Sequence, residues 1–382
     1  MKSNSIRPSI NYLSLTLLIF IFSCSGKKEN AKNEATPTAL KYAVGFSVRA
    51  EGDAKYVSVT SPYQGATKGY HYLLVRVGVS VPPHGDSVQV IRTPIKNIVC
   101  TSTTHIPLLD YLGETNSLIG FPTTDYISSQ SMRKRVDDGL VTDLGIDKGM
   151  NIEVLYSLHP DVVMGYTMSS DLGQLKKIRE LGIPVVINAE YLEKYPLGRA
   201  EWIKFVALFF EKEKEADSVF AVIEKDYLAT MQLAVAAVQK PTVLSGIVYG
   251  DAWFMPAGKN YAAHLLNDAG LDYMWKETDS NGFLELSFES VYAKAKDADL
   301  WIGVGSFSSL GEIKATEPRY GLFKPFSQKQ VYSYNARKGA KGGSEFLELG
   351  YLRPDLILKD LVKIGHPELL PGYELFFHKR LE

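Results

Sequence analysis

One arrangement of residues occurs twice in this chain and limits the folds that the chain can adopt. The stretch GMNIEVLYSLHPDVVMGY, residues 149–166, and the later stretch LSFESVYAKAKDADLWIGVG each place a glutamate at the expected start of a short helix. In both, the glutamate (Glu153 or Glu289) is followed after eight residues by an aspartate (Asp161 or Asp297), and then by an apolar run. The duplication predicts two related units, each with a short helix that leads into a buried strand.

Strand and helix patterns alternate from residue 96 to the C-terminus. The apolar strand candidates are NIVC, SLIGF, DVVMGY and PVVINA in the first half, and PTVLSGIVY, LDYMW, DLWIGVG and QVYSY in the second. Such alternation is typical of parallel sheets covered by helices, and 382 residues are enough for two lobes of ordinary domain size. The sequence therefore predicts an α/β fold with two Rossmann-like lobes, residues 96–210 and residues 239–382.

A long helical pattern lies between the two lobes. Apolar residues recur every three or four positions, with Glu and Lys between them, at Ala216, Phe220, Ile223, Tyr227, Met231, Ala234 and Val238. This spacing keeps one apolar stripe on one side of a helix. We expect residues 211–238 to form one connecting helix. Because a helix resists bending, ligand binding should change the interlobe angle only slightly.

The N-terminal segment has the features of an export signal. Basic residues precede an apolar run from Tyr12 to Phe22, which is too short to span a bilayer and is followed by Cys24. The surroundings of Cys24 resemble a bacterial lipobox, although Phe22 is bulkier than the usual residue there, and a plain signal peptide is the alternative. We expect residues 1–23 to be a lipoprotein signal peptide, Cys24 to carry the lipid, and residues 24–40 to form a flexible tether.

Residues 41–95 differ from the rest of the chain. Apolar and polar residues alternate in KYVSVT and YLLVRVGVSV, and turn residues such as Gly52, Asp53 and Pro62 interrupt them. Alternation with a period of two, bounded by turns, predicts β-hairpins. We therefore expect a small N-terminal β extension before the first lobe, and the residues do not assign it a role.

The order of motifs after Ile95 resembles one protein family. The stretches IKNIVCTSTTHIPLLDYLG, GMNIEVLYSLHPDVVMG, LGIPVVI, RAEWIKFVALFFEKEKEADSVFAVIEKDY and SFESVYAKAKDADLWI are similar to those of bacterial periplasmic binding proteins. The members in question serve ABC importers of iron-siderophore complexes, haem and cobalamin. The resemblance implies two α/β lobes joined by one long helix, a ligand held between them without a further cofactor, and a periplasmic location. The lipid on Cys24 would anchor the protein to a membrane.

The resemblance also assigns a role to the repeated glutamates. In such proteins an acidic residue on the outer face of each lobe meets arginines of the ABC permease, and Glu153 and Glu289 occupy the matching places. The alternative is that each carboxylate only stabilises a helix start through the helix dipole. Helix capping alone would accept Asp, Ser or Thr at either site, so the repeated Glu favours permease docking.

The ligand site of a two-lobed α/β fold lies between the lobes, at loops that follow the carboxyl ends of the strands. Here those loops are rich in Tyr, Trp, Ser and Thr, which suits a broad or chelated organic ligand better than a bare ion. The expected ligand-binding residues are Tyr126, Tyr166, Trp253, Arg319 and Tyr320. Trp253 and Tyr126 should face the ligand from opposite lobes, and Arg319 should pair with an anionic group. The expected ligand is an iron-siderophore or corrinoid-type metal chelate, with haem as the alternative.

Other functions find less support in the residues. The net charge is -1 and the basic residues are scattered, which argues against nucleic-acid binding. Residues 250–259 end in Gly-Lys but lack the glycine spacing of a phosphate-binding loop, and seven scattered histidines give no metal cluster. An exported α/β enzyme is the alternative class, although no G-x-S-x-G, H-E-x-x-H or G-x-G-x-x-G segment occurs in a supporting context.

Overall fold

The structure, a computed structural model, describes Met1, residues 36–37 and residues 39–382. The predicted signal peptide after Met1, the lipidation site Cys24 and the tether up to residue 35 lie outside the described residues. The chain from Ala35 to Glu382 forms one unit by its internal contacts. Among the helices that the structure describes, none is both long enough and apolar enough to cross a membrane.

The first lobe is built on a five-stranded parallel sheet with the order β10-β9-β6-β7-β8. Its strands are β6 (Ile98–Cys100), β7 (Leu118–Phe121), β8 (Thr142–Asp143), β9 (Val162–Gly165) and β10 (Val185–Ile187). Its helices are α1 (Ile106–Tyr111), α2 (Gln130–Asp137), α3 (Ile152–Ser157) and α4 (Gln174–Glu180). The residues of β6, β9 and β10 are all buried, as expected for strands that helices cover on both faces.

The second lobe repeats this plan, with the sheet order β14-β11-β16-β17-β18. Its strands are β11 (Thr242–Ser245), β14 (Asp272–Tyr273), β16 (Leu300–Ile302), β17 (Val331–Ser333) and β18 (Lys379–Arg380), of which only β18 pairs antiparallel. A second, antiparallel sheet contains β12 (Ile247–Tyr249), β13 (Ala252–Pro256) and β15 (Phe283–Leu286). The helices are α8 (Tyr261–Asp268), α9 (Phe288–Ala295), α10 (Leu310–Thr316), α11 (Lys324–Ser327), α12 (Glu345–Leu349) and α13 (Pro354–Gly365).

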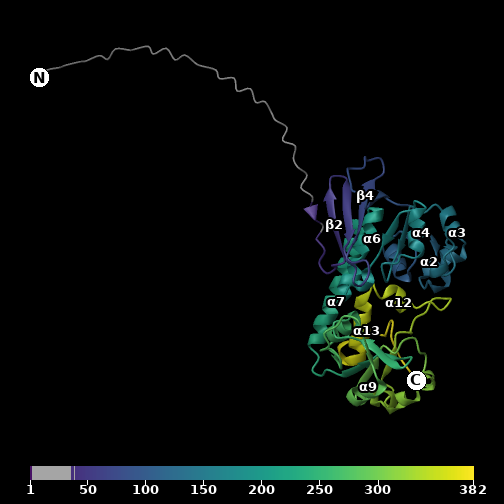
Figure 1. Ribbon diagram of the computed structural model, residues 1–382. Helices are drawn as coiled ribbons and strands as arrows, with labels where there is room; N and C mark the ends of the chain where they lie inside the picture. Colours follow the sequence, from purple (N-terminus) through teal and green to yellow (C-terminus); the bar gives the residue numbers. More distant parts are fainter. Residues whose placement is uncertain (2–35, 38) are drawn as a thin grey trace, which may run out of the picture. The chain divides into compact units, whose positions relative to one another are not determined.

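Three helices connect the lobes: α5 (Pro196–Glu201), α6 (Ile203–Phe210) and the long α7 (Glu213–Val235). The apolar stripe of α7, which includes Phe220, Ile223 and Tyr227, is buried, and the helix packs against α5 and α6 at one side and α13 of the second lobe at the other. Figure 1 shows α7 beside α6 and α13. The predicted fold class, two α/β lobes joined by one long helix with an N-terminal β extension, is confirmed.

The N-terminal β extension is a five-stranded sheet in sequence order. Its strands are β1 (Thr36–Pro37), β2 (Phe46–Glu51), β3 (Ala54–Val59), β4 (Tyr70–Arg76) and β5 (Val88–Thr93). The first four pair antiparallel, whereas β4 and β5 pair parallel, so the expectation of hairpins throughout is wrong for the last strand. Val79 and Val81, in the connection between β4 and β5, pack on Leu73 and Val75 of β4, so this connection crosses a face of the sheet.

The extension covers an open edge of the first lobe. The edge strand β10 has unpaired backbone groups, and the Gln89 side chain satisfies two of them by donating to Val185 O (2.8 Å) and accepting from Val185 N (3.1 Å). The Tyr72 hydroxyl accepts from Ile187 N at 2.9 Å. An uncovered strand edge is a template for pairing with another chain. The extension therefore protects this edge and is held to the first lobe.

Candidate functional site

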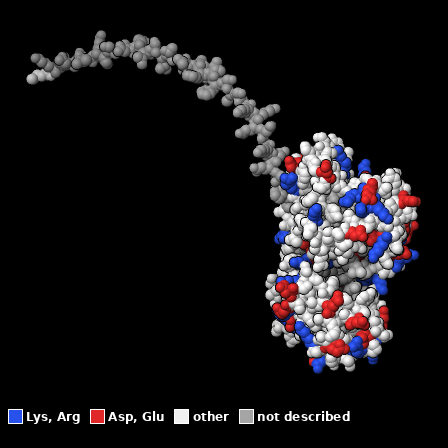
Figure 2. Space-filling model, in the orientation of Figure 1, with Lys and Arg blue, Asp and Glu red and all other residues white. Residues whose placement is uncertain are grey.

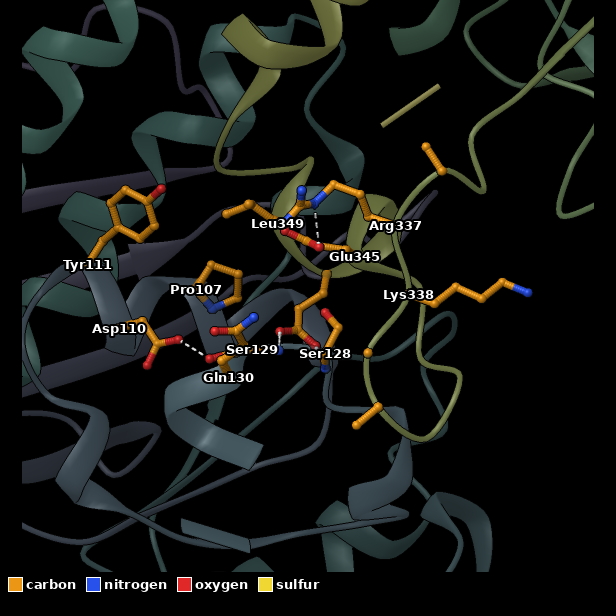
Figure 3. A pocket seen from close by; sticks show the side chains of 14 residues that line it. Pro107, Asp110, Tyr111, Ser128, Ser129, Gln130, Arg337, Lys338, Glu345 and Leu349 are labelled. Carbon is orange, nitrogen blue, oxygen red and sulfur yellow. Dashed lines mark hydrogen bonds and ion pairs between the residues drawn. The ribbon is translucent and has the colours of Figure 1, made fainter. Parts of the chain in front are cut away.

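A cavity of about 690 Å³ lies between the two lobes. Its first-lobe wall consists of α1 and the segment before and at the start of α2, and its second-lobe wall consists of the loop after β17 and α12 (Figure 3). The lining residues are Pro107, Asp110, Tyr111, Ser128, Ser129, Gln130, Ala336, Arg337, Lys338, Gly339, Ala340, Glu345, Glu348 and Leu349. Both walls follow the carboxyl ends of parallel strands, where ligands bind in α/β folds.

The two walls are joined by a carboxylate that crosses from one lobe to the other. Glu348 of α12 accepts hydrogen bonds from Ser128 N (2.7 Å) and Ser129 N (2.8 Å) of the first lobe. Its side chain is buried, and burial raises the pKa of Glu348 to about 7. The contact is therefore between a desolvated acid and two backbone donors.

The remaining charged groups of the cavity are arranged in short polar contacts. In Figure 3 the Asp110 carboxylate points toward Ser129, and it also accepts from the Ser131 hydroxyl at 3.0 Å. Arg337 donates from Nε to Glu345 at 2.8 Å. Lys338 is exposed and forms no ion pair with another described residue. The lining thus combines apolar surface with charged and hydroxyl groups, and it offers one ammonium group, that of Lys338, which has no carboxylate partner there.

A second polar group lies at the carboxyl ends of β6 and β10, and the sequence analysis did not identify it. The Glu190 carboxylate accepts from the Thr104 hydroxyl at 2.5 Å, and burial raises its pKa. One Glu190 oxygen and the Asn188 amide nitrogen are buried without a hydrogen-bond partner among the described residues. The signal that could have found them is their position, since Asn188 directly follows the buried strand β10.

His105 does not behave as a ligand for a metal or haem. It is 1% exposed, neither ring nitrogen has a partner among the described residues, and burial lowers its pKa to about 3. In the described part of the chain no three His, Cys, Asp or Glu residues are grouped to hold a metal ion.

Two of the expected ligand-binding tyrosines lie at the surface of strand-end loops. Tyr126 ends the 3-10 helix after β7 and is 63% exposed. Its backbone oxygen lies so close to Gly343 that a Cβ at that glycine would be 2.1 Å away, so Tyr126 is at the contact between the lobes. Tyr166 directly follows β9 and is 37% exposed. Both remain predictions as ligand contacts.

Trp253 and Tyr320 do not face a cavity, and this corrects the sequence-based expectation. Both side chains are fully buried in the core of the second lobe. Their ring centroids are 5.4 Å apart, and both rings pack against Trp301. The indole of Trp253 donates to Ser245 O at 3.0 Å, and the Tyr320 hydroxyl accepts from Val248 N at 2.6 Å. Trp253 thus joins β13 to β11 of the main sheet, and Tyr320 joins the 3-10 helix Pro318–Leu322 to β12.

Arg319 also lies elsewhere than expected. It does not line the interlobe cavity but sits at the start of α9, where its Nη1 donates to Glu289 at 3.1 Å. Its Nε and Nη2 donate to Glu317 at 2.9 and 2.8 Å, and its guanidinium lies 4.1 Å from the centre of the Phe288 ring. The pKa of Glu317 is lowered by this bidentate contact. Arg319 therefore belongs to the surface around Glu289, which we expect to dock to the permease.

The two repeated glutamates occupy the same position in their helices. Asn151 caps α3 by accepting from Val154 N, and Ser287 caps α9 by accepting from Ser290 N. Glu153 and Glu289 are each the second residue after the cap, in the first turn, and both are exposed. A carboxylate there is favoured by the helix dipole. On the face shown in Figure 2, acidic and basic side chains are interspersed on both lobes.

The aspartate of the repeat is Asp299 and not Asp297. Asp161 N donates to Asn97 O, and the Asp161 carboxylate accepts from Lys96 N and Asn97 N. Asp299 makes the equivalent contacts with Thr242, since its N donates to Thr242 O and its carboxylate accepts from Thr242 N. In each lobe this aspartate joins the start of one strand, β9 or β16, to the start of the adjacent strand, β6 or β11. The spacing from the glutamate differs by two residues between the lobes, and for that reason a fixed spacing selected the wrong aspartate.

Comparisons with known proteins agree with this architecture. The family model for periplasmic binding proteins matches residues 98–337. A protein of Methanocaldococcus jannaschii that is named an uncharacterized lipoprotein is 29% identical over 302 residues, which are 77% of this chain and 70% of the relative.

Two solved structures of low sequence identity share the fold. A possible iron-binding periplasmic solute-binding protein from Staphylococcus epidermidis has a TM-score of 0.56 and 16% identity, and covers 72% of this chain and 100% of its own. The periplasmic haem-binding protein HutB of Vibrio cholerae has a TM-score of 0.53 and 15% identity, and covers 69% of this chain and 99% of its own.

Proposed function

The chain belongs to the periplasmic binding protein family, and from this premise we propose that it is the substrate-binding component of an ABC importer. It captures an iron-siderophore or corrinoid-type metal chelate between its lobes and delivers the chelate to the permease. The observation that carries the proposal is the cavity of about 690 Å³ to which both lobes contribute a wall. A volume of this size is within the range of small-molecule sites.

The lining of the cavity supports a polar ligand. The hydroxyl group of Ser129, the carboxylate of Asp110 and the ammonium group of Lys338 offer hydrogen bonds and charge. A chelate with exposed anionic oxygens would pair with Lys338, because an ammonium group without a carboxylate partner can donate to such oxygens without first breaking an ion pair. Tyr126 and Tyr166 do not line this cavity, so they would contact only a ligand that extends beyond it.

Haem is the second candidate, and the exposed tyrosines are the observation that favours it. A tyrosine phenolate can ligate haem iron, and Tyr126 and Tyr166 both lie at strand-end loops with accessible side chains. One structurally similar protein is named as haem-binding. The Asp110 carboxylate and the Lys338 ammonium group in the lining favour a chelate that exposes polar or anionic oxygens.

Docking to the permease would use Glu153 and Glu289. Both carboxylates are exposed at the first turn of a helix, one in each lobe, so they can meet cations of a partner without any change in the fold. The lipid anchor on Cys24 would hold the protein at a membrane on the periplasmic side, and a relative named as a lipoprotein supports this proposal.

The experiment that tests the ligand assignment is native mass spectrometry with an absorption spectrum of the protein as isolated, followed by titration with ferric catecholate, ferric hydroxamate, cobalamin and haem. We expect one-to-one binding of one metal chelate without turnover. Lys338→Gln should weaken binding of an anionic chelate about tenfold, since one charge-assisted contact is lost. Lys341→Gln is the matched control, because Lys341 is exposed on the same loop but does not line the cavity.

Two outcomes would contradict the proposal. Binding of none of the four compounds by a folded protein would remove the chelate assignment. Conversion of a bound compound to a product would favour the exported enzyme over the importer component.

A further inference from the structure

The contact between α12 and residues 126–129 joins the two lobes beside the cavity. Glu348 is 2% exposed, and its two carboxylate oxygens each accept one backbone hydrogen bond, from Ser128 N and from Ser129 N. The second lobe therefore contacts the first through one carboxylate that accepts from two consecutive backbone N–H groups.

Close backbone packing accompanies this contact. A Cβ on Gly339 would lie 2.6 Å from Ser128 Cα, and a Cβ on Gly343 would lie 2.1 Å from Tyr126 O. Distances below about 3 Å are steric clashes, so only glycine fits at these positions. The loop after β17 and the 126–129 segment must therefore separate together if the lobes move apart, and Glu348 then becomes solvated.

The groups around Glu348 do not include a free cation that faces it. The charge of Asp110 on α1 raises the pKa of Glu348 further. On its own helix Glu345 is paired with Arg337. In Figure 3 the Lys338 side chain extends away from Ser128 and Ser129.

Two further titratable groups belong to elements near α12. His105, on the 3-10 helix packed against α12, is neutral near pH 7 because burial lowers its pKa to about 3. His378 packs against Phe346 of α12 and is paired with Asp360 at 3.0 Å. None of these groups supplies a charge that would hold Glu348 ionised.

An unused acceptor lies beside the carboxylate. The Ser128 hydroxyl oxygen is buried and has no hydrogen-bond partner within the geometric limits among the described residues. Its proximity to the Glu348 carboxylate lowers the pKa of Glu348, against the larger effect of burial, which raises it. A protonated Glu348 could donate to this oxygen while its other oxygen still accepts from Ser129 N. The Ser128 hydroxyl can thus accept a hydrogen bond from the protonated acid, and Ser128 N and Ser129 N donate to the carboxylate.

We propose that Glu348 is a proton-operated latch, in which uptake of one proton from solvent by its carboxyl group favours closure of α12 onto residues 126–129 and loss of that proton favours separation. The proposal rests on the proposed function, because the latch would control access to the same interlobe cavity. Acidification closes the cavity and neutral to alkaline pH loosens it.

The direction of the pH effect follows from the pKa of Glu348 in the closed and in the open state. Burial raises the pKa of Glu348 to about 7 in the closed state, whereas a solvated glutamate has a pKa of about 4.3. The closed state therefore binds the proton more tightly, so closure is favoured as the pH falls below about 7 and is weakened as the pH rises through it. Since one pKa unit corresponds to a tenfold change, the closed-to-open ratio should rise at least about tenfold from pH 8 to pH 5.

The test uses the full mature chain without ligand. Spin labels on Lys134→Cys in α2 and Lys314→Cys in α10, with Cys24→Ser, report the distance between the lobes, and Cys100 stays unreactive because it is buried. The population with the shorter distance should increase from pH 8 to pH 5. The amide signals of Ser128 and Ser129 in the otherwise unmodified protein should shift with a midpoint near pH 7.

Two variants complete the test. Glu348→Gln, which cannot ionise, should remove the pH dependence of both readouts. Glu368→Gln is the matched control, because Glu368 is an exposed glutamate of the second lobe that does not line the cavity, and it should keep the pH dependence.

The proposal is overturned if neither the interlobe distance nor the two amide signals change between pH 5 and 8, or if Glu348→Gln keeps the dependence. Since no ligand and no permease is present, a failure of the proposed function leaves these readouts unaffected. A failed latch, in turn, leaves the cavity and the two docking glutamates in place.

Discussion

The helix starts at Glu153 and Glu289 repeat one local design in two electrostatic settings. Each glutamate follows a side-chain cap by two residues and is exposed. Glu289 is paired with Arg319, which is itself fixed by Glu317. Glu153 forms no ion pair with any residue in the described part of the chain. The two carboxylates are therefore equivalent in backbone position and different in the charge that they present to a partner.

The difference shows which level of structure sets each property. The cap and the first turn come from residues that are adjacent in sequence. The pairing with Arg319 brings together residues 30 positions apart, since the 3-10 helix Pro318–Leu322 packs beside the start of α9. If the docking proposal holds, the first lobe should contribute more to permease binding than the second.

The largest expected effect tests whether the two helix starts act together. Reversal of both charges, Glu153→Lys with Glu289→Lys, should abolish permease association and ligand-dependent uptake, because two like charges would then face the cations of the permease. Ligand affinity should stay unchanged, and the melting temperature should change by less than about 3 °C, since exposed carboxylates contribute little to stability.

Uptake assays with the double variant, together with thermal unfolding and ligand titration, measure this prediction. The matched control is Glu180→Lys with Glu277→Lys, which reverses one exposed charge in each lobe away from the two helix starts. Normal uptake by the double variant would show that the repeated glutamates only stabilise the starts of their helices and do not dock to the permease.

An intermediate effect tests the structural part of the repeat. Asp161→Ala and Asp299→Ala should each lower the free energy of unfolding by about 1 kcal/mol, because each removes hydrogen bonds to backbone N–H groups of the neighbouring strand segment. Asp297→Ala should change it by less than about 0.5 kcal/mol, because Asp297 is exposed. Chemical denaturation of the three variants compares them.

The loss of stability caused by Asp299→Ala should depend on pH. Lys324 and Thr242 lower the pKa of Asp299, so its contribution is present above the ordinary aspartate pKa and is lost as the pH falls through the lowered value. The difference in stability between the native protein and Asp299→Ala should therefore shrink below about pH 4. A loss with Asp297→Ala as large as that with Asp299→Ala would contradict the assignment of the repeat.

The smallest effect tests the asymmetry of the two docking points. Glu153→Lys alone should weaken permease association more than Glu289→Lys alone. Arg319→Gln should strengthen association about two- to fivefold, since it removes the internal partner of Glu289, and exposed ion pairs have energies of this order. Association rates at low and high salt would measure both, because charge complementarity acts mainly on the association rate.

Arg319→Gln also separates two interpretations of that residue. It should leave the affinity for the chelate unchanged, as expected from its distance from the cavity lining. A large loss of ligand affinity with this variant would indicate that Arg319 contacts the ligand and does not belong to the surface that meets the permease.

Much of the fold was predictable because it depends on periodic patterns. The alternation of apolar runs with helical stretches gave two α/β lobes, and the stripe through Phe220, Ile223 and Tyr227 gave the connecting helix, which ends at Val235 and not at the expected Val238. The parallel pairing of β4 with β5 was missed, because alternation indicates a strand but not the direction of its partner.

The candidate site was less predictable, because burial of a single aromatic residue depends on distant parts of the chain. Trp253 lies in a strand-end loop by sequence, but β13 pairs with β15 about 30 residues later, and this pairing turns its ring into the core. Glu348 carried no signal in the sequence, since one more glutamate on an amphipathic helix is usually exposed.

The sequence by itself determined the local chemistry of this protein: the capped helix starts that expose Glu153 and Glu289, the strands of the two lobes, and the helix that joins them. These features depend on residues within a few positions of each other, where backbone geometry fixes which side chains share a face. Only the tertiary structure decided that Arg319 pairs with Glu289 and that Glu348 is buried against Ser128 and Ser129. Both contacts join segments whose proximity depends on the packing of whole lobes. The desolvation that raises the pKa of Glu348 arises only when that packing excludes water.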